Sequence, residues 1–235
     1  PGATIYYTTD GSSPLTNTGN PSANATAYTS PIRISKTTVI RSAATANKFA
    51  TSSWEAHTYL LLDIDNAKAN GTDSNGLNNP ILQQTRPAGY GTFPSGDYNM
   101  DTRITRSTAQ SPGHNGLTIA QAMLQGFKET PSISISMPAA DFVNLYANST
   151  SQGLERACSA EFLPAENDSR PAFQEHCGLK VQGGASRTSS KSPKHSLSFR
   201  FRTEYGAGRL GQVLFPEVDI ENFISIALRA GSNNS

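Results

Sequence analysis

The chain has 235 residues and a formal net charge of +1, with 19 Lys and Arg against 18 Asp and Glu. This balance gives no indication of a nucleic-acid or acidic-membrane partner, and no apolar run approaches the roughly 18 residues of a membrane span. The 36% hydrophobic content, with Ser, Thr, Asn and Gly abundant, favours a loop-rich, mainly β chain that buries one or two modest cores.

The first 60 residues carry strand and turn signals. Apolar and polar residues alternate from Ile5 to Tyr7 and again from Ile32 to Val39, while Asp10 to Pro14 is strong turn chemistry. The stretches Gly2 to Pro14 and Ala27 to Ala44 resemble the chitobiase/β-hexosaminidase C-terminal domain, an immunoglobulin-like β module with the signature Y-T-x-D-G-S-x-P. The resemblance predicts such a module over residues 1–60, truncated at its N-terminus because only about four to five of its seven or so strands can be drawn.

Aromatic residues in this segment suggest a further possibility, glycan binding. Tyr6, Tyr7, Tyr28 and Trp54 could form a platform on which a sugar ring stacks. Alternating aromatic residues in a β module are more often half-buried residues of the sheet, and this interpretation is the one we favour.

Residues 61–130 are expected to form a connector. Asp63, Asp65 and Asp73 suggest a calcium loop, but Ala67 and Ala69 stand where further oxygen ligands are needed, and no Glu closes the loop. We therefore interpret these residues as solvated loop carboxylates and expect no metal site. Asp97 and Asp101 are likewise expected to be turn or capping residues.

Helical spacing is confined to the middle of the chain. Apolar residues recur with this spacing between Leu117 and Phe127, which predicts one amphipathic helix that ends before Pro131. Residues 133–137 alternate as a strand, and 138–146 suit a short helix with Pro138 in its first turn. We expect an α+β arrangement from about residue 116 onward.

The chain contains two cysteines, Cys158 and Cys177, which are too few for a zinc site. Both lie in strand-like segments, and an antiparallel pairing of the two would centre the turn between Asn167 and Asp168, where turn residues occur. This placement favours a cross-strand disulfide over two free thiols, and a disulfide favours an oxidising compartment. Asn167 also begins a glycosylation sequon at an accessible tip. A catalytic Cys–His pair that uses His176 or His195 has no further support.

A second hairpin is predicted around residues 179–181 and 197–201, where apolar and polar residues alternate. The connecting loop contains Gly183 and Gly184, which permit close backbone approach, and the cations Arg187, Lys191 and Lys194. This combination suits an anion such as a nucleotide phosphate. The chain has neither dinucleotide-binding nor P-loop glycine motif, so an ordinary solvated hairpin loop remains an alternative.

Three runs, Gly178 to Arg187, Ser192 to Arg202 and Phe223 to Asn233, resemble the opening of the spore coat protein H (CotH) kinase-like family. The resemblance implies that residues 131–235 are the N-terminal part of a kinase-like domain, truncated at its C-terminus, with Lys194 and Arg187 as phosphate contacts. His195 replaces the family's usual second lysine. Because the family's metal-binding and catalytic acids lie further downstream, ATP and magnesium are expected only for a complete domain, and no catalytic residue is assigned here.

The expected fold is therefore mainly β with an α+β C-terminal part: an immunoglobulin-like module followed by the β-rich N-lobe of a kinase-like fold. The leading function hypothesis is a non-catalytic fragment of a secreted protein whose full-length form resembles an ATP-dependent protein kinase. The alternative is an extracellular surface or matrix protein that uses these folds for adhesion or assembly. Expected partners are other domains of the same protein and an extracellular protein or glycan.

Overall fold

A computed structural model describes residues 2–34, 38–60, 107–114, 116–191, 194–218 and 220–230. These residues fall into two compact units, one with 2–60, 107–132 and 163–169, and the other with 133–162 and 170–230. Most of the predicted connector, including Asp63, Asp65, Asp73, Asp97 and Asp101, lies outside the described residues. No helix in the described part is long and apolar enough to cross a membrane.

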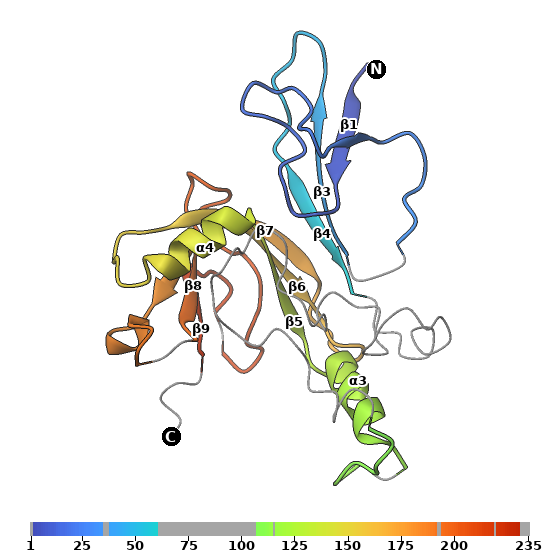
Figure 1. Cartoon of the computed structure of the whole chain (residues 1–235), viewed down its shortest axis with the longest axis vertical. Helices are drawn as coiled ribbons and strands as arrows, with labels where there is room; N and C mark the ends of the chain where they lie inside the picture. The colour runs from blue at the N-terminus through green and yellow to red at the C-terminus, as the bar shows by residue number, and fades with distance from the viewer. Residues whose placement is uncertain are drawn as a thin grey trace. The chain divides into compact units, whose positions relative to one another are not determined.

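The N-terminal strands form one antiparallel sheet with the order β2-β1-β3-β4 (Figure 1). The strands are β1 (Thr4–Thr8), β2 (Thr26–Ala27), β3 (Thr38–Thr45) and β4 (Glu55–Tyr59). The prediction of a strand around Ile32 and Ile34 was wrong, because residues 31–34 pair with no neighbouring strand and β3 begins at Thr38. Pro31 at its start cannot donate a ladder hydrogen bond.

The buried face of this sheet is organised around a charged residue, Arg41. Arg41 lies opposite Thr8 on β1 and Ala56 on β4, and all three are almost fully buried. Its guanidinium lies 3.7 Å from the centre of the Trp54 ring and donates a 2.7 Å hydrogen bond to the carbonyl of Gly11. Burial lowers the pKa of Arg41 from 12.5 to about 10. The module thus buries a cation that an aromatic face and a turn carbonyl stabilise.

Both predicted helices are present. Helix α3 (Ile119–Glu129) begins with a capping box in which the Thr118 hydroxyl accepts from the Gln121 N–H and the Gln121 side chain accepts from the Thr118 N–H. Helix α4 (Ala139–Ala147) follows Pro138, whose ring favours a helix start and cannot continue a ladder. The helical spacing in the sequence therefore predicted both elements within about two residues of their ends.

The second sheet has the order β5-β6-β7-β8-β9. Its strands are β5 (Ser132–Ser136), β6 (Arg156–Leu163), β7 (Phe173–Gln182), β8 (Ser196–Arg200) and β9 (Ser225–Leu228). The pairs from β6 to β9 are antiparallel, and Cys158 lies directly opposite Cys177. The register predicted from the turn around Asn167 is confirmed, as is the mainly β fold with helices in the C-terminal part.

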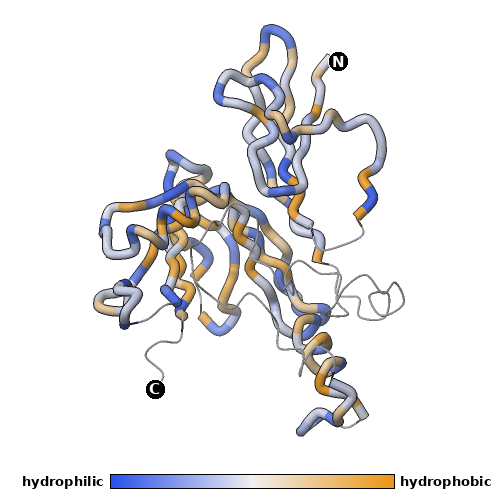
Figure 2. Tube along the Cα trace, in the orientation of Figure 1, coloured by the Kyte–Doolittle hydropathy of each residue, from blue (hydrophilic) through white to orange (hydrophobic). Residues whose placement is uncertain are grey.

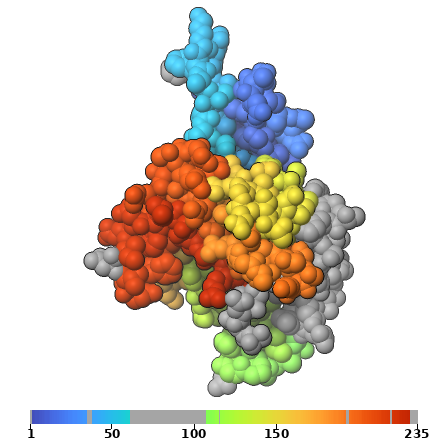
Figure 3. Space-filling view, turned by 90° about the vertical axis from the view of Figure 1, so that its left-hand side faces the viewer, coloured from blue at the N-terminus to red at the C-terminus, as the bar shows by residue number. Residues whose placement is uncertain are grey.

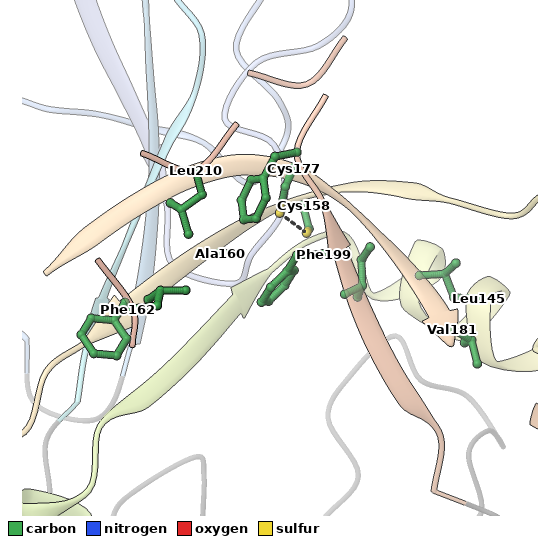
Figure 4. Packing of buried hydrophobic residues seen from close by; sticks show 11 residues of the cluster. Leu145, Cys158, Ala160, Phe162, Cys177, Val181, Phe199 and Leu210 are labelled. Atoms are coloured by element: carbon green, nitrogen blue, oxygen red, sulfur yellow. Dashed lines mark hydrogen bonds between the residues drawn. The ribbon is translucent and has the colours of Figure 1, made fainter. Parts of the chain in front are cut away.

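One face of this sheet forms the main core. Leu179 and Val181 of β7 and Phe199 of β8 are nearly inaccessible, and Leu145 packs from α4 (Figure 4). Hydrophobic residues are interspersed with hydrophilic ones along these strands (Figure 2). Because side chains alternate between the two faces of a strand, the intervening residues Lys180, Ser198 and Arg200 lie on the other face. That face carries the candidate site.

Candidate functional site

The face opposite the core contains a hollow of about 400 Å³, which we call the basic hollow. Three cations line it, Lys180, Arg187 and Arg200, and its described lining includes no carboxylate or aromatic ring. The remaining lining residues are Gln152, Gln182, Gly183, Gly184 and Val181. An excess of unneutralised positive charge in a concave surface attracts anions, because the converging fields of the cations add.

The β7–β8 pairing places two of these cations. Lys180 lies opposite Ser198, and Arg200 lies opposite Gly178, so the two cations are diagonal neighbours on one face. Gly183 follows β7 with a φ of 125°, and a Cβ there would lie 2.5 Å from the Ser186 hydroxyl. The turn out of β7 therefore requires glycine at this position.

The loop between α4 and β6 forms the wall of the hollow that orients Arg187. The Ser149 hydroxyl, almost fully buried, donates a 2.7 Å hydrogen bond to the carbonyl of Arg187. In return, Nη1 of Arg187 donates to the carbonyl of Thr150 at 3.2 Å. Figure 3 shows the α4 region in yellow beside orange residues of the β7–β8 region. The Nε atom of Arg187 is buried and has no hydrogen-bond partner in the described part of the chain.

The other two cations differ in how they are held. Lys180 donates through Nζ to the carbonyl of Gln152 at 3.1 Å, so the same α4–β6 loop orients it. The side chain of Arg200 makes no hydrogen bond or ion pair with any residue that the structure describes. Each cation therefore retains N–H donors that no acceptor in the described ranges uses.

His195 holds the far end of the β7–β8 loop. It is 3% exposed, and its Nδ1 lies 3.0 Å from the carbonyl of Ser186, to which it donates. Its Nε2 then accepts from the Ser189 hydroxyl at 3.4 Å, and the Tyr146 ring packs against it at 5.0 Å. His195 is thus a buried structural residue of the loop. Its hydrogen bond ends on Ser186, which directly precedes Arg187.

Lys194, the other phosphate contact that the resemblance implies, lies outside the basic hollow. It is exposed, it precedes β8 by two residues, and it is not among the residues that line the basic hollow. Of the two predicted phosphate contacts, Arg187 lines the hollow. The role of Lys194 in nucleotide binding stays a prediction.

The two cysteines meet in the core with sulfur atoms 3.5 Å apart, and the structure has them as thiols (Figure 4). A hydrogen bond with Cys158 and burial raise the pKa of Cys177 far above its ordinary value. A thiol with a raised pKa is a poor nucleophile, so the geometry gives no support to a Cys–His catalytic pair. The predicted disulfide requires the two sulfurs to approach by about 1.5 Å.

The remaining sequence candidates are dispersed. Tyr6 and Tyr7 are consecutive on β1 and so point to opposite faces, while Trp54 packs under Arg41, so no single aromatic platform forms. Asn167 is exposed on the segment that joins β6 to β7, as expected of a sequon at the tip. Within the described ranges, no three His, Cys, Asp or Glu side chains come together as metal ligands.

The α4–β6 loop is the part of the site that the sequence did not reveal. Ser149, Thr150 and Gln152 contribute a hydroxyl and two backbone carbonyls, and they lie about 30 to 40 residues from their partners in the chain. A backbone carbonyl leaves no trace in the residue pattern, and a contact across such a separation depends on the fold. Only the glycines and cations of the β7–β8 loop carried a signal.

Comparison with known proteins bears on the N-terminal unit. Residues 1–59 match the family described as Fn3 associated. These residues are an Fn3-associated β domain. No curated protein and no solved structure matches the chain. The match thus covers β1 to β4, and it supports neither a chitobiase-type nor a CotH identity.

Proposed function

We propose that this chain joins an Fn3-associated β domain to a unit that binds the phosphate groups of a nucleotide in the basic hollow. The observation that carries the proposal is the lining of the hollow, where Lys180, Arg187 and Arg200 come together and the lining residues that the structure describes include no carboxylate. Hydrogen bonds between such cations and phosphate oxygens are charge-assisted, each contributing about 1.5–3 kcal/mol.

The finer form of the proposal follows the sequence resemblance. In this form, the second unit is the front of a CotH kinase-like domain in a secreted protein, and ATP is the nucleotide. Arg187 in the β7–β8 loop supports it, because the resemblance assigned phosphate contacts to Arg187 and Lys194, and Arg187 lines the hollow. The proposal is one of binding and not of phosphate transfer, since the lining residues that the structure describes include no carboxylate to hold a metal ion.

Equilibrium dialysis with labelled ATP tests the proposal. The 235-residue protein should bind ATP, and Arg187→Gln should weaken binding about tenfold or more, as the loss of a charge-assisted contact predicts. Arg209→Gln removes the same charge from an exposed position of the same unit and should bind like the parent protein. Absence of ATP binding, or equal losses in both variants, would contradict the proposal.

A second candidate function, extracellular adhesion or assembly, is favoured by apolar exposure on the Fn3-associated domain. Ile5 is 45% exposed, and Tyr28, whose N–H bonds to the Ile5 carbonyl, is 47% exposed. Neighbouring exposed apolar residues are a common feature of protein contact surfaces. Sedimentation velocity tests self-assembly directly: an Ile5→Ser, Tyr28→Ser variant should abolish any concentration-dependent association, and a monomer at all concentrations would remove this form of the candidate.

A further inference from the structure

We infer that the basic hollow recognises a chain of phosphate groups by charge alone, so that inorganic tripolyphosphate binds this protein about as tightly as ATP. The inference rests on the proposed function and deepens it, because it states which part of a nucleotide is recognised. The nucleobase and ribose then contribute little to affinity in this chain.

The described lining of the hollow offers no surface on which a nucleobase could stack. Sites for small organic ligands are mostly apolar and aromatic, with a few polar groups that fix orientation. Among the lining residues that the structure describes, Val181 alone is apolar, and it is 4% exposed and belongs to the core on the other face. Tyr146, an aromatic residue of the neighbouring helix, packs on His195 and does not line the hollow.

The cations of the hollow also keep hydrogen-bond donors that the described residues do not use. A lysine ammonium has three N–H donors and an arginine guanidinium five. The side chains of Lys180 and Arg187 each donate one hydrogen bond, to the carbonyls of Gln152 and Thr150, and those bonds fix the side chains without neutralising them. The Nε atom of Arg187 has no acceptor among the described residues, but it is buried, so the donors left for an incoming oxyanion are the other N–H groups of the guanidinium and the lysine ammonium.

The spacing of the three cations also suits a chain of phosphate groups. Lys180 and Arg200 are diagonal neighbours across β7 and β8, and residues in that relationship lie roughly 7–8 Å apart. Arg187 approaches from the loop that joins the two strands. Cations that come from two strands and a loop surround an elongated anion better than a single compact one. Successive phosphates of a chain supply the oxyanions, and each guanidinium can bind one in a bidentate manner.

Isothermal calorimetry on the 235-residue protein separates the possibilities with three ligands: inorganic tripolyphosphate, ATP and adenosine. Ionic strength is matched throughout with sodium chloride, because free ions screen such contacts. We expect dissociation constants for tripolyphosphate and ATP within about threefold of each other, and no detectable binding of adenosine. ATP that binds about tenfold or more tightly than tripolyphosphate would overturn this inference and leave the proposed function intact. Binding of neither would overturn both.

Variants test whether the basic hollow is the site. Arg200→Gln should weaken both phosphate ligands by the same factor, about ten- to a hundredfold. Arg209→Gln is the matched control and should leave both unchanged. A folded Arg200→Gln protein with parent affinity would overturn the assignment.

The NMR amide signals of Gly183 and Gly184 provide a test that needs no variant. Tripolyphosphate and ATP should shift both signals alike, and signals that stay unshifted on saturation would place the ligand elsewhere.

Discussion

Cys158 and Cys177 face each other as a register pair of β6 and β7, with both side chains buried and their sulfur atoms 3.5 Å apart. The pairing of the two strands therefore places both cysteines where a disulfide can form. The two β-strands bring together cysteines that are 19 positions apart in the chain.

The first prediction is that a glutathione redox buffer converts this pair to a disulfide, with the two thiols losing two hydrogens to glutathione disulfide. Closing a loop of this length should raise the free energy of unfolding by about 3 kcal/mol. Intact mass spectrometry under non-reducing conditions, together with calorimetry with and without reductant, measures both effects. A Cys158→Ala, Cys177→Ala variant is the control and should show no dependence on reductant. Thiols that stay reduced in the folded protein under oxidising buffer would contradict the prediction.

The second prediction concerns the pH dependence of the Fn3-associated domain. Burial acts to raise the pKa of Asp10, but hydrogen bonds donated by the Ser12 hydroxyl and N–H and by the Asn24 amide outweigh it and hold the pKa below its ordinary value of 3.8. A carboxyl whose pKa is lower in the folded than in the unfolded state contributes stability above the unfolded value and loses it as pH falls through the folded value. Thermal unfolding temperature should therefore drop below about pH 4.

Asp10→Asn should flatten that pH dependence, because the titrating group is removed while the side-chain shape is kept. Ser12→Ala should reduce it in part, since Ser12 provides one side-chain hydrogen bond and its backbone N–H remains. An Asp10→Asn protein that loses stability with acid as steeply as the parent would show that another carboxyl is responsible.

The third prediction is that Gly178→Ala destabilises the second unit by about 1–3 kcal/mol, as overpacking of a tight site does. Gly178 is buried, and an added Cβ would overlap the carboxylate of Glu155 and the ring of Tyr205. Glu155 would then be pushed from its 3.1 Å ion pair with Arg202. Gly211→Ala is the matched control, since nothing lies within 4 Å of its Cβ position. Chemical denaturation of both variants measures the difference, and equal midpoints would contradict the prediction.

The fourth prediction separates the two cations that the sequence proposed. Arg187→Gln should weaken ATP binding about tenfold or more, and Lys194→Ala should weaken it less, because Lys194 is exposed and lies outside the basic hollow. Calorimetry on both variants provides the comparison. A larger loss in Lys194→Ala would contradict the prediction and show that the main phosphate contact lies outside the basic hollow.

The sequence predicted elements whose signal is local. Alternation around Leu179 and Phe199 predicted β7 and β8 and their core face, and the turn residues near Asn167 predicted the register of the cysteines. These succeeded because the period of a strand and the chemistry of a turn are written in adjacent residues.

The parts that failed depend on contacts across the fold. Ile32 and Ile34 alternate like a strand, yet β3 starts later, since pairing with β1 and β4 decides which residues join the ladder. The burial of Arg41 against Trp54 could not be foreseen, because composition suggests that arginine stays exposed. The α4–β6 wall of the hollow was missed for the same reason.

The two hydrogen bonds from Lys180 and Arg187 end on carbonyls of one short segment, at Gln152 and Thr150, directly after α4. A displacement of that helix would carry both carbonyls with it and change the distance between the two positive charges. The position of α4 therefore determines the spacing of the two charges. A partner that binds to α4 and displaces it would change the affinity of the hollow for anions without contacting the hollow.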